Sequence, residues 1–477
     1  MNRREFLHQS TIATGLMASN RPFAPFASFA DEASPVQVNV HTEQVLGVIP
    51  PDFIGLGYEI SSVARHGLLS ANNHVYAQLV RALGRQGVLR VGGNTADYAS
   101  YSRDGKAVSA PKSTLVNQES LEELGSFLHA TGWKLIWGLN LGKGTEQDAV
   151  EEALSVNSAV KDSLMAFEIG NEVDLFSHEG HRPPGYTFVQ YLEEYRRYKA
   201  AVRAKLPYAQ FAGPDIAGKT DWVTQFAAAE GHDLTLLTHH YYRAGESPAS
   251  SLEMLLNPDP KLAPILETLR QASASLRVPY RICETNSFSG GGRPGVSGTF
   301  GAALWVLDYM FILASADAAG VNMETGVNQR GFVSSYSPIG DNEQGTYTAM
   351  PEFYGMLAFA QGSRGERLAV SVETQGVNLT AYAVAQERKR VTVTLINKDH
   401  TRAAAVKLTS GHEFNRGTIL RLTAPSLEST TGITFGEASV TPDGGWKATR
   451  TESLRQRAGT GHILLPAGSA VVVKLTE

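Results

Sequence analysis

The sequence has a single cysteine, Cys283, among 477 residues, so no intrachain disulfide can form. No pairing partner supports a nucleophilic thiol at Cys283, and a buried structural thiol is the preferred interpretation. No apolar run approaches the ~20 residues that a membrane span needs. The net charge is −5, with both signs mixed along the chain and no basic stripe. Nucleic acid is therefore not expected as a partner, although a local basic cleft can lie within an acidic total.

Motifs for nucleotide and metal chemistry are also missing. The first apolar run ends in Gly55-Leu56-Gly57-Tyr58-Glu59, which lacks the third glycine of a dinucleotide-binding turn. Gly290-Gly291-Gly292 is not followed by the Gly-Lys-Ser/Thr of a phosphate loop, so a loop that offers N–H groups to a substrate is better supported. His239-His240 are adjacent strand residues that point to opposite faces, which favours structural roles for both. We expect neither a metal site nor a cofactor.

The N-terminal segment has the pattern of a targeting signal. Arg3-Arg4 precede the mildly apolar stretch Ser10–Ala18, and Ser28-Phe29-Ala30 offers small residues at a cleavage point. This pattern predicts a twin-arginine-type signal peptide over residues 1–30, with export to the periplasm or beyond the cell. A disordered basic tail is the alternative.

Between residues 50 and 362, short apolar runs alternate with segments of helical periodicity. The helical segments include Ser120–Ala130, Phe188–Lys205 and Pro264–Leu276. The apolar runs are Phe53–Tyr58, Val88–Val91, Leu135–Leu139, Leu164–Ile169, Phe211–Ala212, Leu234–Thr238, Tyr280–Cys283 and Gly320–Met323. Strand followed by helix, repeated about eight times, is typical of a parallel barrel. We therefore predict an α/β fold with a (β/α)8 TIM barrel at residues 50–362.

Beyond the barrel the pattern changes to alternating strands separated by turns such as Pro442-Asp443-Gly444-Gly445. This alternation predicts a C-terminal antiparallel β-sandwich domain at residues 363–477. Residues 31–49 contain one further strand-like run, Val36–Val40. We expect this N-terminal strand to join the sandwich.

Polar residues follow the apolar runs of the barrel, at the edge where barrel active sites lie. They are mostly acids, amides and aromatics, which suits sugar recognition and carboxylate chemistry. These residues are Glu59, Arg90, Asn94, Asn140, Asn171, Glu172, Asp215, His240, Tyr242, Glu284 and Glu324.

Glu172 ends the sharpest local motif, Phe167–Glu172. Strand alternation places Glu168 and Glu172 on one face, with Glu168 deeper in the barrel as a structural partner. Glu172 would lie at the rim, within reach of a glycosidic oxygen. The preceding Asn171 can bind a sugar hydroxyl beside the reacting carbon.

Glu284 ends the later run Tyr280–Cys283. Two glutamates from different strands can face each other across a cleft, and retaining glycoside hydrolysis needs roughly 5–5.5 Å between two carboxyl groups. Apolar surroundings and the charge of Glu284 would keep Glu172 protonated as an acid. Tyr242 is placed to hold Glu284 through its hydroxyl. Surface ion pairing of both glutamates is the alternative.

These segments together resemble glycoside hydrolase family 79, the group of β-glucuronidases and heparanases. The matching segments are Leu89–Asp97, Leu135–Asn140, Glu168–Glu172, Gly213–Asp215, His239–Tyr242 and Cys283–Phe300. The resemblance implies a (β/α)8 barrel with a C-terminal β-sandwich, retention at the anomeric carbon and no cofactor. It implies that Glu172 is the acid/base, that Glu284 is the nucleophile and that Tyr242 supports the nucleophile.

The resemblance also implies how the substrate is held. The amides of Gly290 or Gly291, together with Tyr336, would bind the substrate carboxylate without an Arg or Lys, as backbone N–H groups can. Glu59 and Asn94 would bind sugar hydroxyls. Ser289 departs from the pattern, because some relatives carry an aromatic residue there, and this loss would reshape the sugar subsite.

The leading hypothesis is an exo-acting β-glucuronidase that removes terminal glucuronate, 4-O-methylated or not, from glycans. An endo-β-glucuronidase of the heparanase kind, or another clan A enzyme such as a β-xylosidase or β-glucosidase, stays open. A carbohydrate-binding protein without catalysis is the non-enzyme alternative, which the presence of both glutamates disfavours. The oligomeric state is not readable from the sequence.

Overall fold

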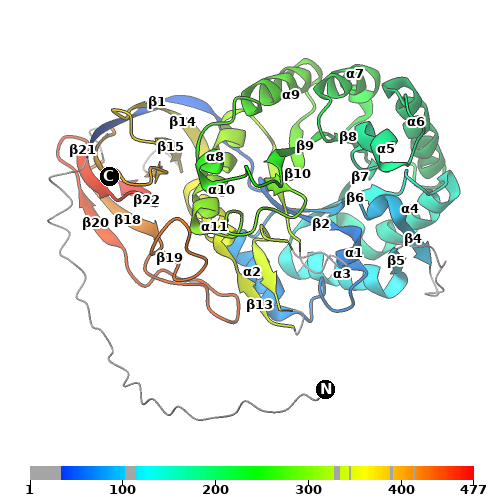
Figure 1. Ribbon diagram of the computed structural model, residues 1–477, viewed down its shortest axis with the longest axis horizontal. Coiled ribbons are helices and arrows are strands. Elements are labelled where there is room, and N and C mark those ends of the chain that lie inside the picture. The colour runs from blue at the N-terminus through cyan, green and yellow to red at the C-terminus, as the bar shows by residue number, and fades with distance from the viewer. Residues whose placement is uncertain (1–33, 103–113, 327–333, 343–344, 387–389, 412–413) are drawn as a thin grey trace, which may run out of the picture.

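The computed structural model describes residues 34–102, 114–326, 334–342, 345–386, 390–411 and 414–477 (Figure 1). The predicted signal peptide at residues 1–30 lies outside these ranges. None of the helices within them is long and apolar enough to cross a membrane.

The larger part of the molecule is a parallel eight-stranded barrel, which confirms the predicted fold class (Figure 1). Its strands pair in the order β7-β6-β3-β2-β11-β10-β9-β8. A parallel bridge between Phe167 and Phe211 joins β7 to the segment before β8 and closes the ring. The strands are β2 (Ile54–Glu59), β3 (Val88–Gly92), β6 (Lys134–Leu139), β7 (Leu164–Ile169), β8 (Ala212–Ile216), β9 (Leu236–Gly245), β10 (Tyr280–Ser289) and β11 (Gly320–Glu324).

Helices surround this barrel, and their first residues show why they begin where they do. Thr145 and Asp148 form a reciprocal capping box at the start of one helix, and Thr187 with Gln190 does the same at another. The main helices are α2 (His74–Leu83), α3 (Gln118–Thr131), α4 (Glu146–Val160), α6 (Phe188–Lys205), α7 (Thr220–Glu230), α9 (Leu262–Leu276), α10 (Phe300–Ser315) and α11 (Pro351–Gly362). Shorter ones are α1 (Ile60–Val63), α5 (Phe176–Glu179) and α8 (Leu252–Leu256).

Three barrel strands continue beyond the runs predicted from apolar residues alone. β9 extends to Gly245 and β10 to Ser289, and β8 reaches Ile216. Most of the extra residues are polar, because they lie toward the open end of the barrel, where side chains face a cleft rather than a core. Glu284 therefore lies in the middle of β10, not at its end.

The second part of the molecule is a curled ten-stranded sheet (Figure 1). Its order is β19-β18-β22-β16-β15-β14-β1-β17-β21, with β20 paired to β18. The pairs are antiparallel except that of β1 with β17, which is parallel. The strands are β1 (Ser34–Ile49), β14 (Gly365–Glu373), β15 (Leu379–Ala385), β16 (Arg390–Asn397), β17 (Ala404–Thr409), β18 (Arg416–Thr423), β19 (Thr434–Phe435), β20 (Glu452–Arg455), β21 (Thr460–Leu465) and β22 (Ser469–Thr476).

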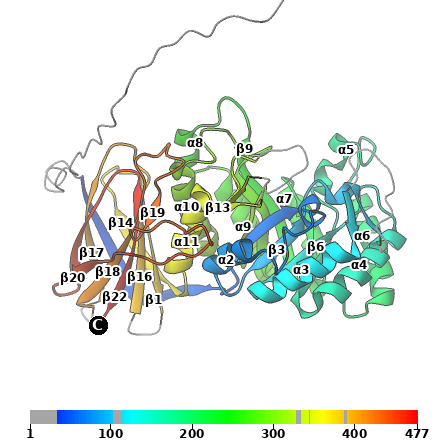
Figure 2. The same ribbon diagram turned by 90° about the horizontal axis from the view of Figure 1, so that it is seen from below.

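The barrel and the curled sheet share a packed junction, in which α10 and α11 lie between them (Figure 2). Asp308 of α10 accepts hydrogen bonds from Thr380 at 2.6 Å and Tyr382 at 2.7 Å, and it also pairs with Lys398. The ring of Phe311 stacks on Tyr382 with centroids 4.5 Å apart. The sheet is thus fixed against one side of the barrel, and the C-terminal ends of the barrel strands stay open.

Candidate active site

Glu172 leaves the end of β7 through a tight turn of the backbone. β7 ends at Ile169, and Gly170 (φ 84°) and Glu172 (φ 49°) both adopt left-handed conformations. A Cβ at position 170 would lie 2.6 Å from Val173 Cγ1, so the turn requires glycine. The Glu172 N–H donates to the Asp215 carbonyl at 2.8 Å. This turn, rather than the strand alternation that we expected, directs the Glu172 side chain.

Glu284 projects from β10 beside an irregularity in the strand pairing, since the register with β9 shifts between Ile282 and Glu284. Its Oε2 accepts a hydrogen bond from Arg90 at 2.8 Å, and its Oε1 accepts one from the Tyr242 hydroxyl at 3.0 Å. The Glu284 side chain is 11% exposed. The carboxylate is thus held by two donors and still reaches the cleft.

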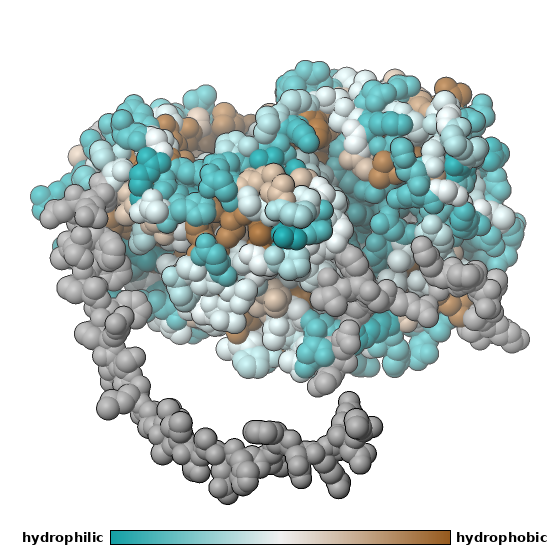
Figure 3. All heavy atoms as spheres, in the orientation of Figure 1, coloured by the Kyte–Doolittle hydropathy of each residue, from teal (hydrophilic) through white to brown (hydrophobic). Residues whose placement is uncertain are grey.

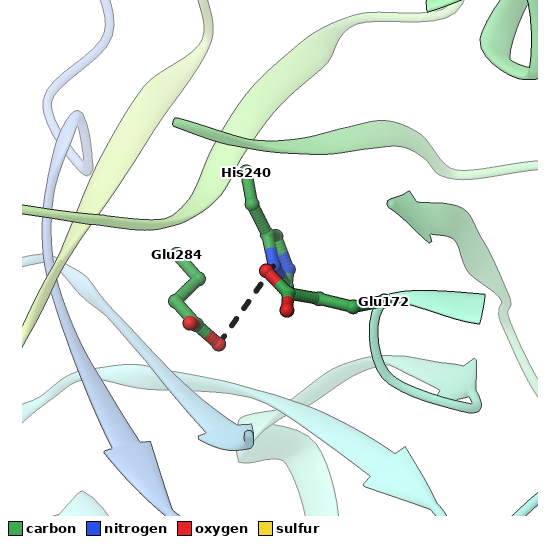
Figure 4. A group of neighbouring side chains, drawn as sticks. All are labelled: Glu172, His240 and Glu284. Carbon is green, nitrogen blue, oxygen red and sulfur yellow. Dashed lines mark hydrogen bonds and ion pairs between the residues drawn. The ribbon is translucent and has the colours of Figure 1, made fainter. Parts of the chain in front are cut away.

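The two glutamates face each other across the mouth of the barrel (Figure 4). One oxygen of each carboxyl group and one nitrogen of His240 all lie within 4.8 Å of one another. The Glu172 side chain is 13% exposed. The face above the barrel is hollowed and largely hydrophilic (Figure 3). An oxygen-to-oxygen separation of at most 4.8 Å between Glu172 and Glu284 fits the close spacing of retaining glycoside hydrolases, roughly 5–5.5 Å between carboxyl groups, better than the roughly 6.5–9.5 Å of inverting ones.

Arg90 lies beneath the pair and is completely buried. Its guanidinium donates to Glu168 Oε2 at 3.0 Å, to Glu284 Oε2 at 2.8 Å and to Asn171 Oδ1 at 2.8 Å. It also pairs with Asp215. One cation therefore joins β3, β7, β8 and β10, and Glu168 has the structural role that its depth in the barrel predicted.

His240 is part of the site, which corrects the structural role that we expected for it. Its Nδ1 lies 3.0 Å from Glu172 Oε1 and its Nε2 lies 2.6 Å from Asp215 Oδ1. Burial opposes the charged form, but the carboxylates of Asp215 and Glu284 and the two hydrogen bonds raise the pKa of His240 well above its ordinary value. An imidazolium at this position donates to both Glu172 and Asp215.

Neighbouring charges separate the acids of the site into two kinds. Burial raises the pKa of Glu172, and the charge of Glu284 raises it further, while the hydrogen bond from His240 opposes both. Asp215 behaves in the opposite way, because Arg90 and His240 overcome the effect of burial and lower its pKa to about 2. The surroundings of Glu172 thus favour its protonated form, whereas those of Asp215 favour the carboxylate.

The residues expected to bind sugar hydroxyls form one cluster on the rim. Glu59 accepts hydrogen bonds from the backbone N–H of Asn94 at 3.1 Å and that of Thr95 at 2.7 Å. Asn94 is exposed, and its Oδ1 accepts from the Asn171 amide at 3.2 Å. Burial, followed by the charge of Glu284, raises the pKa of Glu59 to about 7. The structure therefore brings Glu59, Asn94 and Asn171 together beside the two glutamates.

The glycine loop and Tyr336 also lie side by side. Gly290 (φ 77°) and Gly291 (φ 90°) follow β10 directly, and the Gly291 carbonyl accepts from the Ser335 N–H at 2.6 Å. A Cβ at Gly292 would lie 3.0 Å from Tyr336 Cδ1. Tyr336 is buried, with its ring centroid 6.3 Å from that of Tyr242. The loop thus lies against Tyr336, whose ring is next to that of Tyr242, the residue that donates a hydrogen bond to Glu284.

Glu172, His240 and Glu284 are the group in the described part of the chain whose spacing could hold a metal ion. A metal needs a free lone pair on the imidazole, whereas both nitrogens of His240 face carboxylates and its pKa is raised. Glu284 Oε2 already accepts a hydrogen bond from the Arg90 guanidinium at 2.8 Å. The donor set therefore suits proton transfer better than metal binding.

Three residues of the site are candidates at strand ends to which the sequence assigns no role: Arg90, Asp215 and Glu324. The sequence does contain one signal for them, because an arginine inside the apolar run Leu89-Arg90-Val91 must find buried acceptors. The sequence does not say which acids provide them. Burial, together with the charges of Glu284 and Glu59, raises the pKa of Glu324 well above its ordinary value.

The chain is similar to known glycoside hydrolases and β-glucuronidases. Residues 381–472 match the family model "Glycosyl hydrolase family 79 C-terminal beta domain". A β-glucuronidase of Aspergillus niger is 28% identical over 443 residues, 82% of this chain and 80% of that protein. A β-glucuronidase of Neurospora crassa is 26% identical over 557 aligned residues, 94% of this chain and 98% of that protein.

A solved structure shows the same fold over nearly the whole chain. It is a 4-O-α-L-rhamnosyl-β-D-glucuronidase from Fusarium oxysporum, with a TM-score of 0.73, 19% identity and coverage of 92% of this chain and 99% of that one. The chain spans most of the length of these relatives, and the resemblance carried by its motifs is confirmed. This protein is a glycoside hydrolase that resembles glycoside hydrolase family 79.

Proposed function

We propose that the protein is a retaining, exo-acting β-glucuronidase in which Glu172 is the acid/base and Glu284 is the nucleophile. The observation that carries the proposal is the separation of at most 4.8 Å between oxygens of two carboxyl groups in different electrostatic surroundings. Glu172 has a raised pKa, whereas Glu284 accepts hydrogen bonds from a guanidinium and a phenol. One group can donate a proton while the other attacks.

The mechanism follows from these positions. Glu172 protonates the glycosidic oxygen as a Glu284 oxygen attacks the anomeric carbon, which breaks the bond to the aglycone and forms a covalent glycosyl-enzyme. Glu172, now a carboxylate, removes a proton from water, which attacks the same carbon and releases Glu284. Two inversions give net retention. His240 and Asp215 stabilise the Glu172 carboxylate formed after the first step.

The preference for glucuronate rests on the named relatives and on the loop beside Glu284. Among described residues, the Gly290 and Gly291 N–H groups donate to no protein acceptor, which supports a role for them in binding the substrate carboxylate. The Tyr336 ring lies beside them. The adjacent cations, Arg90 and His240, are already paired with acids of the site. Export by a twin-arginine-type signal remains part of the proposal on sequence grounds.

A panel of 4-nitrophenyl glycosides tests the substrate class. We expect rapid release of nitrophenol from the β-D-glucuronide and little from the β-D-glucoside, β-D-xyloside and α-L-arabinofuranoside. The same panel with the Glu284→Gln variant controls for a contaminating enzyme. Turnover of another glycoside with none of the glucuronide would contradict the assignment. Digestion of a uronate-bearing polymer that releases only monosaccharide at first distinguishes exo from endo action.

Replacing Glu172 by glutamine should slow turnover most for substrates whose leaving group must be protonated as the glycosidic bond breaks. For an alcohol aglycone we expect a loss of roughly 10²–10⁴-fold. For a dinitrophenol, which leaves unaided, glycosylation should be much less affected. The wild-type kcat/KM should fall as pH rises through the raised pKa of Glu172, because the acid must be protonated. This alkaline limb should be absent from the variant.

Glu179 provides the matched control for this profile. It lies near the site, and its pKa is raised to about 7 by burial, followed by the charge of Glu172. A Glu179→Gln variant should retain the alkaline limb and the aglycone dependence. If the limb disappears in Glu179→Gln and persists in Glu172→Gln, the acid has been assigned to the wrong residue.

A further inference from the structure

A second site candidate lies on the curled sheet, away from the barrel mouth. The first residues of β16 and β18 and the last residues of β20 and β22 line an open groove with a volume of about 690 Å³. Four cations line it, Arg390, Arg416, Arg455 and Lys474. We call this surface, defined by these four residues, the basic groove.

The strand pairing places the three arginines in a single row. Arg455 pairs with Arg416, Arg416 pairs with Thr476, and Thr476 pairs with Arg390. Residues paired across strands project from the same face of a sheet, so the row crosses four strands on one face. At roughly 4.8 Å per strand it spans about 14 Å. Lys474 belongs to the next row of the same face, where it pairs with Thr418.

This row is electrostatically unfavourable as a purely structural surface. Like charges directly opposite each other on neighbouring strands are destabilising, and Arg416 faces Arg455 in this way. Within the described ranges none of the four cations has a carboxylate partner within 4.0 Å. Arg421, on the same strand as Arg416, shows the contrast, because Glu452 binds it through both carboxylate oxygens. The basic groove thus concentrates positive charge on a protein whose net charge is −5.

The basic groove is separate from the catalytic cleft. α5 and α8 follow the C-terminal ends of barrel strands and lie at the top of Figure 2, whereas the C-terminus lies at the bottom. Thr476, which lies in the arginine row between Arg416 and Arg390, is the residue before that terminus. A ligand in this groove would therefore not compete with a sugar at Glu284.

The lining chemistry selects among anionic ligands. Ser453, Thr418 and Thr476 add hydroxyl groups between the cations, and the described lining contains no aromatic ring. Nucleic-acid and neutral-sugar sites rely on such rings for stacking. An open groove with a row of charges suits an extended chain that carries repeated anions and hydroxyl groups.

We propose that the basic groove binds a carboxylated polysaccharide, a chain of uronate residues, at a distance from the active site. The choice of a uronate polymer rests on the proposed function, while the groove and its charge do not. Binding there would hold the enzyme on an acidic glycan and raise the local concentration of chain ends around the catalytic cleft.

The test is direct binding of fluorescently labelled polyglucuronate, measured by anisotropy with the Glu284→Gln protein, so that the probe is not degraded. The variant Arg390→Ser/Arg416→Ser/Arg455→Ser in that background should weaken binding roughly 10- to 100-fold. A matched triple variant, Lys205→Ser/Lys261→Ser/Lys407→Ser, removes the same charge from other exposed positions. It should bind as the parent does. Raising the salt concentration should weaken parent binding, because salt screens exposed charges.

The readouts distinguish this proposal from the proposed function. Binding that depends on the three arginines supports the groove even where no aryl glucuronide is cleaved, and that second result counts only against the glucuronidase assignment. Equal binding by the two triple variants overturns the groove proposal even where glucuronide is cleaved. Tighter binding of duplex DNA or phosphatidylglycerol vesicles than of polyglucuronate also overturns it. Thermal unfolding of each variant verifies that the sheet is intact.

Discussion

Replacing Glu284 by glycine is expected to reduce glucuronide hydrolysis by about 10⁴-fold or more, because the covalent step then has no nucleophile. The side chain bonds to Arg90 and Tyr242 but carries no core packing, and it is 11% exposed. The variant should therefore fold. The measurement is kcat with an activated aryl glucuronide, compared between wild type and variant under the same conditions.

Added azide makes this prediction specific to the nucleophile. In Glu284→Gly a small anion can enter the vacated space and attack the anomeric carbon from the nucleophile's side, which gives an α-glycosyl azide in a single inversion. In Glu172→Gly the covalent intermediate still forms, so azide attacks it from the opposite side and gives the β-azide. Identification of the product anomers by NMR distinguishes the two roles. A β-azide from the Glu284 variant would reverse the assignment.

The barrel could be predicted from the sequence because its signal is local and repeated. Each strand is an apolar run of ordinary length, and each helix has its own cap, as at Thr145 and Thr187. The ends of β9 and β10 were less predictable, because polar residues interrupt their apolar runs from His239 and from Glu284 onward. A polar residue ends an apolar run in the sequence, whereas in the fold it can continue the strand and face the cleft.

In the candidate site, too, the residues with a local sequence signal were predictable and the long-range contacts were not. Glu172 and Glu284 could be predicted because each follows an apolar run of the barrel, and the polar residues after such runs face the cleft in barrels of this kind. The partners of Arg90 could not, because its acceptors lie 78, 81, 125 and 194 residues away in sequence. Pairing over such distances depends on barrel closure, and residue type alone cannot rank the acids.

His240 shows a second limit. The alternation argument, that His239 and His240 point to opposite faces, excludes a shared metal ion but leaves the role of each histidine undetermined. The pKa of buried His239 is lowered to about 4, chiefly by burial, whereas Asp215 and Glu284 raise that of His240. Adjacent residues of one type thus have opposite protonation, which is set by neighbours from other strands.

Replacing Arg90 by methionine should have the largest effect on stability. It leaves Glu168 buried without its cation and Asp215 with His240 alone, and breaking a buried ion pair in this way costs about 3–5 kcal/mol of unfolding free energy. Activity should also be lost, since Arg90 holds Glu284 and Asn171 in place. Urea unfolding and glucuronide turnover measure the two effects.

The pH dependence of that deficit distinguishes lost charge from lost packing. In the wild type, Arg90 helps to lower the pKa of Asp215 to about 2, so the stability from Asp215 is present above its unfolded pKa and is lost only as pH falls through about 2. Without Arg90, only His240 opposes the effect of burial, so the folded pKa of Asp215 rises. The buried carboxylate then costs more as pH rises, and the deficit should be larger at neutral than at acid pH.

Arg281 provides the control, because it is also a buried arginine of a barrel strand. It donates to Asn322 and to the carbonyls of Phe53 and Val321, and within the described ranges it contacts no carboxylate. Arg281→Met should therefore destabilise the protein by an amount that does not change between acid and neutral pH. Equal pH dependence in the two variants would mean that Arg90 acts by packing alone, and that the charges beneath Glu172 and Glu284 are not coupled to it.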